Sequence, residues 1–460
     1  MSIKKNAQTT YFLSYECGFV AQTSFELTPL QYLDFLITLI PHLRTPLKTK
    51  IQVETISLEN KKFSCCLFSI NTNDFILNET TWGGGAFNNC LNEIAISDVL
   101  QKLGYPIPQQ KINFPLIANS ELFNTIQSTY QKSYPQLTFQ HIDGLPRQAV
   151  IFSCSSIQNI LTQTTPFTAE IREKISILNT LGLDLTNPHV IKETLPKSIN
   201  IHNQIPTITH HAPYCPLDAY GFYPINNHLP NEDFDCLDHL EKTAEIEFRI
   251  GSTQINTLCS DELPKFKQRF PHLNPADSTI DRKIFPTLWL LQKAKRVCLN
   301  LSEVQQIIEH ESNYTFLPRP LEKDSLITRF VEDFGIQEAI VSDSTKPLTI
   351  ASIDRVTSLV KIEHFSTQPH IMETLQSLFQ KHQLLTVENE TGCGDALVIG
   401  LELGRQLRDI YFPQKTNDAI AQFGLNIATA KFLWKESNFG NIPKEILQDI
   451  VSNSLNYFLN

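Results

Sequence analysis

Apolar residues recur along the chain in patterns typical of alternating strands and helices. Near the start, Thr28 and Pro29 precede an amphipathic stretch, which predicts a helix that is capped by Thr28 and runs to Leu39. Alternating or continuous apolar runs predict strands, and runs with helical spacing that stop at a glycine predict helices. The further elements expected here are strands at Ile51–Ile56, Phe63–Ile70, Leu137–Ile142 and Gln148–Phe152, and helices at Phe87–Leu103, Leu122–Gln131 and Thr168–Thr180.

The second half of the chain continues this alternation. The expected helices are Ile284–Lys295, Ser302–Glu309, Ser325–Phe334, Ile371–Lys381, Asp395–Leu407, Asn417–Trp434 and Pro443–Phe458, and the expected strands are Arg296–Leu299, Ala339–Val341 and Leu384–Val387. Strands that alternate with helices predict an α/β fold, with a parallel sheet covered by helices on both faces. Between the two halves, residues 186–232 carry seven prolines and little periodicity, which predicts a long irregular insertion.

Composition narrows the class of protein. The chain has 460 residues, more than one average domain, and its 41% hydrophobic and 19% charged residues are enough for a large folded core. The net charge of -10 argues against binding to nucleic acid or to anionic membranes. No apolar run approaches the ~18 residues of a membrane span, and the first residues lack the apolar stretch of a secretory signal. We therefore expect a soluble, cytoplasmic protein whose ten scattered cysteines are reduced.

Glycine is scarce, and seven of the 16 glycines fall in two short windows. In one window, the apolar residues 384–387 run into the segment Gly392–Asp395, after which a helix is expected. Glycines at this position let backbone N–H groups converge at a helix N-terminus, where the helix dipole also favours a phosphate. Asp395 in the same turn can accept the proton of an attacking hydroxyl. The alternative is a helix capped by Asp395 whose glycines serve only tight packing, and the spacing alone favours neither.

The other glycine window, Gly83–Gly85, also lies before an expected helix. A backbone without side chains can approach a ligand closely, and Asn88 or Asn89, one turn later, offers both a donor and an acceptor to a polyol. The alternative is a flexible turn that binds nothing, because three glycines alone specify little.

Polar residues also follow the strand expected at Arg296–Leu299. Asn300 and Glu303 lie at the carboxyl end of this strand, which is the edge where ligands bind in parallel sheets. A carboxylate and an amide suit a hydrated magnesium ion, which takes only one or two oxygen ligands from protein. The alternative is that both residues cap the following helix.

Taken together and in this order, the three windows resemble the carbohydrate kinases of the ribokinase (PfkB) family. Residues 389–397, Asn-Glu-Thr-Gly-Cys-Gly-Asp-Ala-Leu, are similar to the second signature of the family. Gly83–Asn88 is similar to the first signature, and Asn300–Glu303 matches the family's N-x-x-E motif. The segment 419–432, followed by Phe439–Pro443, resembles the final helix, glycine turn and proline of these kinases.

The resemblance implies an α/β fold of the ribokinase-like type. This fold is a three-layer sandwich with a mainly parallel central sheet and a small β-sheet lid. One kinase domain would then span residues 1–460, with lid strands within 45–80 and 137–155 and with 186–232 as an irregular, proline-rich insertion.

The resemblance also implies a magnesium- and nucleotide-dependent kinase that phosphorylates a hydroxyl of a sugar or of a sugar-like or nucleoside-like molecule. The implied site residues are Asp395 as catalytic base; Gly392, Cys393 and Gly394 as anion hole; Gly83, Gly84 and Asn88 as acceptor contacts; Thr391, Ser342 and Ser344 as nucleotide contacts; and Asn300 and Glu303 as magnesium ligands. ATP is the expected donor. An ADP-dependent sugar kinase and an inactive nucleotide-binding sensor or interaction protein stay open as alternatives, as does a homodimer.

Overall fold

The computed structural model divides the chain into two compact units, and each is described by itself. Unit 1 comprises Met1–Phe19, Gly83–Asp143 and Ile208–Asn460, and unit 2 comprises Val20–Trp82 and Gly144–Thr207. The residues that the structure describes are 9–14, 19–43, 47, 50–53, 56–107, 112–162, 167–203, 207–208, 244–249, 296–301, 303–305, 308, 322–334, 336, 338–343, 346–354, 357, 359–386 and 388–459.

Strands form the centre of unit 2. They are β2 (Val20–Glu26), β3 (Lys50–Val53), β4 (Ile56–Glu59), β5 (Lys62–Cys65), β6 (Ser69–Asn71), β7 (Ile76–Gly83), β10 (Arg147–Ser153) and β11 (Ser198–Asn203). Five of them make a mixed sheet of order β3-β11-β10-β2-β7, in which β10 is parallel to β2 and antiparallel to β11. The other three form a small antiparallel sheet. Several of these strands fall within the ranges expected for a lid, and their role as a lid stays a prediction.

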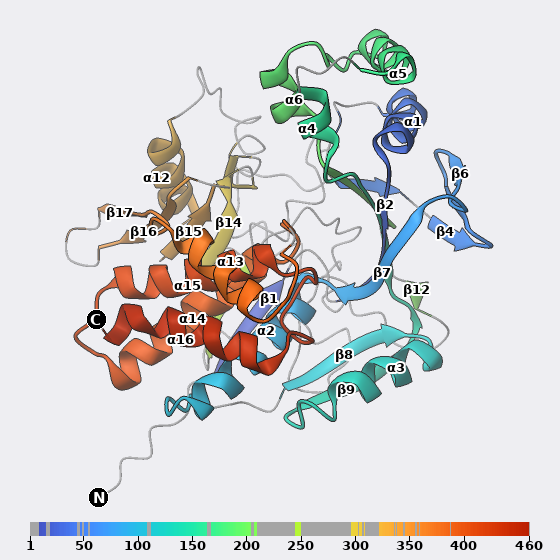
Figure 1. Ribbon diagram of the computed structural model, residues 1–460. Coiled ribbons are helices and arrows are strands. Elements are labelled where there is room, and N and C mark those ends of the chain that lie inside the picture. Colours follow the sequence, from blue (N-terminus) through green and yellow to red (C-terminus); the bar gives the residue numbers. More distant parts are fainter. Residues whose placement is uncertain are drawn as a thin grey trace, which may run out of the picture. The chain divides into compact units, whose positions relative to one another are not determined.

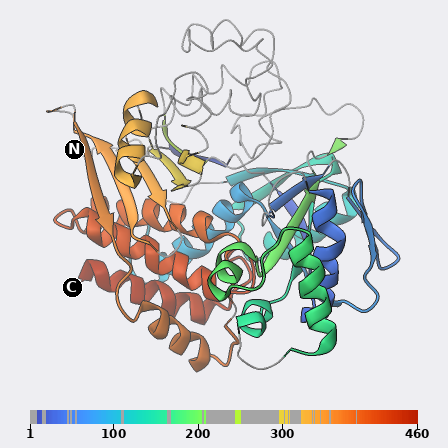
Figure 2. The same ribbon diagram turned by 90° about the horizontal axis from the view of Figure 1, so that it is seen from above.

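Four α-helices pack with these strands around an aromatic core. They are α1 (Pro29–Leu39), α4 (Ile157–Thr162), α5 (Ala169–Thr180) and α6 (Pro188–Thr194), and a 3-10 turn, η1 (Ile40–His42), follows α1. Figure 2 shows α1 in dark blue beside α5 in green, as does Figure 1. The ring of Phe152 stacks on Phe25 and lies 4.6 Å from the ring of Phe35. The burial of such large apolar side chains is the main source of stability in this unit.

The helix expected after Thr28 is confirmed as α1. Thr28 Oγ1 accepts a hydrogen bond from the Gln31 amide, and Gln31 Oε1 accepts one from the Thr28 amide, which is a complete capping box. Pro29 occupies the first helical position, where its missing N–H costs nothing.

The expectation of an irregular segment at residues 186–232 is wrong for the part that the structure describes. Helix α6 and strand β11 both lie within this range. Pro188 begins α6 and Pro196 follows its end, so these prolines mark the limits of a helix instead of interrupting one. In β11 the alternate residues Ile199 and Ile201 are buried, and this short alternation went unrecognised between the prolines. Residues 209–232 lie outside the described residues.

Unit 1 is built on a six-stranded mixed sheet. Its strands are β1 (Thr9–Ser14), β13 (Ala244–Arg249), β14 (Arg296–Asn300), β15 (Glu338–Ser342), β16 (Leu348–Ile353) and β17 (Val360–Phe365), in that spatial order. The first four are parallel, whereas β16 and β17 continue the sheet as antiparallel neighbours. The α/β class is confirmed, and the fully covered parallel sheet expected from the sequence is corrected to a mixed one. A separate three-stranded sheet has the order β12-β9-β8. Its strands are β8 (Ile112–Ala118) and β9 (Leu137–Leu145), which pair in parallel, and β12 (Thr207–Ile208).

Helices lie on both sides of the strands β15–β17, as Figure 1 shows. The helices of unit 1 are α2 (Gly85–Lys102), α3 (Ser120–Tyr130), α12 (Lys323–Phe334), α13 (Ile371–Lys381), α14 (Cys393–Tyr411), α15 (Asn417–Leu433) and α16 (Lys444–Leu459). Helix α12 packs on β15–β17, and α15 packs on β17 from the other side. Arg405 of α14 forms an ion pair with Glu338 of β15, which links a second helix to the sheet.

The strand expected at Leu384–Val387 is wrong, since the described residues 384–386 are not part of any strand. Helix α13 ends instead with Gln383 in the left-handed region at φ 58°, and the Leu384 amide donates to the Phe379 carbonyl. This is the geometry of a helix C-terminal cap. Leu385 is 91% exposed, so the apolar run does not enter the core.

Among the described helices, none combines the length and the apolar character needed to cross a bilayer. The six cysteines within the described ranges are all free thiols, as expected.

Glycines bring helices α14 and α15 into very close contact. A Cβ atom added at Gly400 would lie 2.8 Å from the Cα atom of Gly424 and 3.2 Å from the Cβ atom of Ile427. The backbones of the two helices therefore meet at a distance that only glycine permits. This contact matters for the candidate site, because the start of α14 and the end of α15 both adjoin segments that form the site.

We expect Gly400→Ala to lower the free energy of unfolding by roughly 1–3 kcal/mol, since the added methyl group forces two helix backbones apart. Urea denaturation measures this change. The matched control is Gly404→Ala in the same helix, where the nearest atoms to an added Cβ, those of Ile420, lie at 3.4 Å. That substitution is expected to be nearly neutral, because alanine favours the helix. An equal loss of unfolding free energy in both variants would show that the close contact of α14 with α15 at Gly400 is not what the substitution disturbs.

Candidate active site

Residues 389–395, here called the glycine loop, lead into helix α14. Gly392 is the N-cap, and Cys393, Gly394 and Asp395 form the first turn. The Thr391 amide donates to Asn389 Oδ1 at 3.0 Å, and the Cys393 amide donates to the Glu390 carbonyl at 3.2 Å. These bonds fold the loop into a tight turn at the N-terminus of α14, where the positive end of the helix dipole lies. The Cys393 N–H, expected to bind an anion, donates within the loop instead.

Gly392 is the residue that lets this turn approach the rest of unit 1. Its φ of 84° lies in the left-handed region, and a Cβ atom added there would lie 1.9 Å from the carbonyl oxygen of Ser437. Ser437 belongs to the segment Glu436–Asn441, here called the polar turn, which follows α15. The sequence predicted a close backbone approach at Gly392, and the structure identifies the polar turn as the partner.

Asp395 and Asn88 are brought together although 307 positions separate them. Asn88 Nδ2 donates to Asp395 Oδ2 at 2.9 Å, and both side chains are buried. Ser437 Oγ and Asn438 Nδ2 each donate to Asn88 Oδ1 at 3.1 Å. Because two donors occupy the amide oxygen of Asn88, its NH₂ group is directed at Asp395 and favours the ionised carboxylate.

The first glycine window begins the helix that carries Asn88. Gly83 is the last residue of β7, and Gly84, at φ 110°, is the N-cap of α2. The Asn88 amide donates to the Gly84 carbonyl at 2.8 Å, so Asn88 lies in the first turn of α2. The first turns of α2 and α14 thus meet through Asn88 and Asp395, and contact between Gly83 or Gly84 and an acceptor stays a prediction.

The glycine loop is also tied to the end of helix α15. The Asn389 amide donates to the Phe432 carbonyl at 2.8 Å, and Asn389 Nδ2 donates to the Lys435 carbonyl at 2.6 Å. Lys431, whose side chain is fully buried, has its Nζ 3.5 Å from the Asn389 carbonyl oxygen and 3.4 Å from that of Trp434. The sequence indicated the glycine turn at Phe439–Pro443, which overlaps the polar turn, but it did not indicate Lys431, Ser437 or Asn438, because a lysine in a helix and short polar side chains are usually solvated.

Asn300 and Glu303 lie together at the carboxyl end of β14, as predicted. The Asn300 amide donates to Glu303 Oε2 at 2.8 Å, and the Glu303 amide donates to Asn300 Oδ1 at 2.9 Å. This reciprocal pair is the arrangement of the capping alternative. A carboxylate and an amide oxygen side by side are also a donor set that a hydrated magnesium ion accepts, so the two residues fit the ion by their chemistry.

The next strand, β15, ends beside Asn300. Ser342 pairs with Asn300 in the register of the two strands, and Ser342 Oγ donates to the Leu299 carbonyl at 3.4 Å. Ser344 lies outside the described residues. The two strand ends that carry the expected magnesium and nucleotide contacts are therefore neighbours in the sheet.

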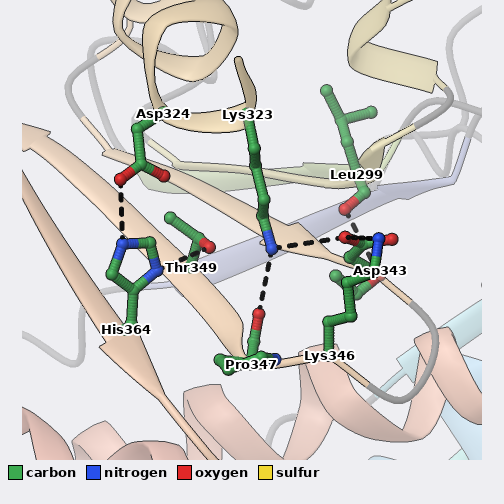
Figure 3. Close-up of polar contacts among 9 residues, drawn as sticks. Leu299, Lys323, Asp324, Asp343, Lys346, Pro347, Thr349 and His364 are labelled. Carbon is green, nitrogen blue, oxygen red and sulfur yellow. Dashed lines mark hydrogen bonds and ion pairs between the residues drawn. The ribbon is translucent and has the colours of Figure 1, made fainter.

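Figure 3 shows that charged residues surround the end of β15. Asp343 Oδ2 lies 3.5 Å from Lys323 Nζ and 3.3 Å from Lys346 Nζ. Lys323 also donates to the Pro347 carbonyl at 3.2 Å. Asp343 therefore forms ion pairs with Lys323 and Lys346 at this strand end. Lys323 comes from α12 and was not indicated by the sequence.

Comparisons with known proteins give a likeness of fold. No protein-family model and no curated protein matches the chain. Among solved structures, ribokinase from Thermotoga maritima matches over 97% of this chain and 100% of its own, at 10% identity and a TM-score of 0.44. Adenosine kinase from Sinorhizobium meliloti matches over 98% and 99%, at 8% identity and 0.49, and phosphofructokinase-2 from Escherichia coli over 99% and 100%, at 10% identity and 0.43. The chain thus resembles kinases of the ribokinase family over nearly its whole length at low sequence identity.

Proposed function

We propose that the chain is a magnesium- and nucleotide-dependent kinase that transfers the terminal phosphate of its donor to a hydroxyl of a sugar or sugar-like molecule. One observation carries this proposal. A buried aspartate, Asp395, lies in the first turn of a helix that begins with a glycine turn, and an asparagine amide from the first turn of another helix hydrogen-bonds its carboxylate. A proton acceptor and the positive N-terminal end of a helix are thereby adjacent, which is a combination suited to phosphoryl transfer to a hydroxyl.

The proposed chemical roles divide between Asp395, Asn88 and the first-turn N–H groups of α14. Asp395 accepts the proton of the attacking hydroxyl, and Asn88 holds that carboxylate in its ionised form until the proton arrives. The first-turn N–H groups of α14, at Gly394 and nearby, stabilise the negative charge on the phosphate as it moves. Because the transition state of phosphoryl transfer is loose, positioning and charge stabilisation supply most of the rate enhancement.

The donor nucleotide and its metal ion are assigned to the strand ends of β14 and β15. Asn300 and Glu303 would hold magnesium there, and Ser342 with Thr391 would contact the nucleotide. Bound magnesium would neutralise phosphate charge. The expected acceptors are sugars or nucleosides, and the contact proposed for Asn88 would come from its remaining Nδ2–H group, because its Oδ1 already accepts two hydrogen bonds and its other Nδ2–H is directed at Asp395.

An acceptor panel tests the proposal directly. The chain is incubated with magnesium and either ATP or ADP in separate reactions, together with sugars, nucleosides and sugar phosphates, and phosphorylated products are identified by mass spectrometry. We expect acceptor-dependent product with at least one donor, and the two donor arms separate the ATP-dependent from the ADP-dependent alternative. Nucleotide binding by calorimetry without any turnover across the panel would favour the inactive sensor instead.

The hydrogen bond between Asn88 and Asp395 leads to a prediction about how the rate depends on pH. We expect Asn88→Asp to lower the rate at neutral pH by about tenfold to a hundredfold, because a second carboxylate at hydrogen-bond distance favours protonation of Asp395. The rate should recover as the pH rises. The pH dependence of kcat measures this, and Asn88→Ala is the control, since it removes the amide without adding charge. Identical pH profiles for the two variants would show that Asn88 does not act on the ionisation of Asp395.

A further inference from the structure

Lys431 is a buried cation that the proposed chemistry does not use. It lies in the last turn of α15, its side chain has no exposed surface, and its ammonium group lies among backbone carbonyl oxygens of the glycine loop and of the residues after α15. Removing a charged ammonium from water is costly unless nearby groups compensate. The groups that surround Lys431 therefore indicate which interactions compensate for the burial of its charge.

Three negative or potentially negative groups act electrostatically on this ammonium. Cys393 and Asp395 belong to the first turn of α14, and Glu436 belongs to the polar turn. Burial lowers the pKa of Lys431 to about 8, and these three groups oppose that shift. At neutral pH the side chain is therefore mostly protonated, and its positive charge lies next to the Asn389 carbonyl of the glycine loop.

The contacts of Lys431 connect the two segments that build the site. The Asn389 carbonyl belongs to the glycine loop, and it also accepts a bond from Cys393 Sγ at 3.3 Å. The Trp434 carbonyl lies at the start of the segment that leads to the polar turn. One ammonium thus contacts the glycine loop and the C-cap of α15, two residues before the polar turn, whereas an apolar side chain would fill the same space without binding either carbonyl.

We propose that Lys431 is a positioning residue of the glycine loop, whose buried positive charge fixes the loop against the end of α15 and favours an anion at the first turn of α14. This inference rests on the proposed function only in assigning that anion to a transferred phosphate. The positive potential itself is a property of the chain and acts on any anion there, including the thiolate of Cys393. Cys393 is half-buried within the loop and so serves as a reporter.

The test uses alkylation of Cys393 by iodoacetamide in the full-length chain. The rate is followed by peptide mass spectrometry from about pH 6 to 10, a range that spans the titration of an ordinary thiol, with and without inorganic phosphate. The variants are Lys431→Met, Lys431→Gln and Lys431→Arg. Met removes the charge and the donor, Gln keeps a donor without charge, and Arg keeps the charge. The matched control is Lys435→Met, which removes an exposed cation near the same loop.

We expect Lys431→Met and Lys431→Gln to slow alkylation about tenfold at neutral pH, where Lys431 is charged in the wild-type chain. Inorganic phosphate should protect Cys393 in the wild-type chain, and both neutral variants should need about tenfold more phosphate for equal protection. Lys431→Arg should behave like the wild type at neutral pH, because it keeps the buried charge that Lys431 carries there. Lys435→Met should behave like the wild type over the whole pH range, because water screens the exposed charge of Lys435.

Several results would overturn the inference. One is a folded neutral variant that keeps the wild-type alkylation profile and phosphate protection. Another is a wild-type chain in which Cys393 stays unmodified over the whole pH range or phosphate gives no protection. A thermal midpoint that falls while the profile stays unchanged would reduce Lys431 to a structural role. A failure of the kinase proposal would appear separately, as an absence of turnover with every acceptor while the alkylation results stand.

Discussion

Replacing Asp395 by asparagine is expected to reduce kcat for phosphoryl transfer about a thousandfold, which is within the usual contribution of a general base. The substitution preserves the shape of the side chain, and its amide oxygen can still accept the hydrogen bond from Asn88 Nδ2 that Asp395 Oδ2 accepts at 2.9 Å. The change therefore removes the capacity to take a proton and leaves the packing of the first turn of α14 in place. Steady-state kinetics on the best acceptor of the panel, with KM measured for both substrates, tests this expectation.

The matched control for this experiment is Asp418→Asn. Asp418 lies in the first turn of α15 as Asp395 lies in the first turn of α14, but its partner is Gln422 of its own helix. We expect that variant to retain the wild-type rate. A thermal melt of each variant confirms that both are folded. Turnover by the Asp395→Asn variant at close to the wild-type rate would remove Asp395 from the role of base.

Replacing Gly392 by alanine is expected to lower the free energy of unfolding by roughly 3–5 kcal/mol and to abolish activity. Two effects combine at this position. The φ of 84° is strained for any residue with a Cβ atom, and that atom would lie 1.9 Å from the Ser437 carbonyl oxygen, which is backbone and cannot rotate away. The glycine loop must therefore move away from the polar turn, which displaces Asp395 from Asn88.

Gly104→Ala isolates the strain from the clash. Gly104 follows α2 with a similar φ of 89°, but an added Cβ atom there meets nothing within 4 Å. We expect that variant to lose only about 1 kcal/mol, which is the cost of the left-handed conformation alone. Urea denaturation of the two variants compares them directly. A similar loss of stability in both would show that the approach of Gly392 to Ser437 is not tight.

Much of the local structure could be predicted from the sequence, because it depends on residues close together in the chain. Thr28 and Pro29 specify the start of α1 through hydrogen bonds within four residues, and helix α13 occupies the predicted range Ile371–Lys381. The glycine loop was predicted for the same reason, since Gly392 is needed where backbone turns sharply into a helix. That local pattern also indicated Asp395 as a candidate base, and its role stays a prediction.

The errors arose where structure depends on distant partners. The run Leu384–Val387 is apolar enough for a strand, but it follows a helix cap, and its described residues 384–386 pair with no strand. The hairpin of β16 and β17 turns a parallel sheet into a mixed one, and strand direction is set by pairing that the sequence does not encode locally. Within the site, the sequence does not indicate the roles of Lys431, Ser437 and Asn438, because these roles depend on distant contacts. Lys431 contacts the glycine loop, and Ser437 and Asn438 contact Asn88, which precedes them by more than three hundred positions.

The pairing of β1 with β13 has a consequence for how the chain reaches its native state. Thr9 lies opposite Ala244, so an outer strand of the main sheet must wait for a partner that the ribosome makes on the order of ten seconds or more later. During that interval the backbone groups of β1 lack their native partners and can pair with other strands. We therefore expect nascent chains of this protein to depend on protection of their first residues, and refolding from denaturant to be slow, as is usual when contacts join distant parts of a chain.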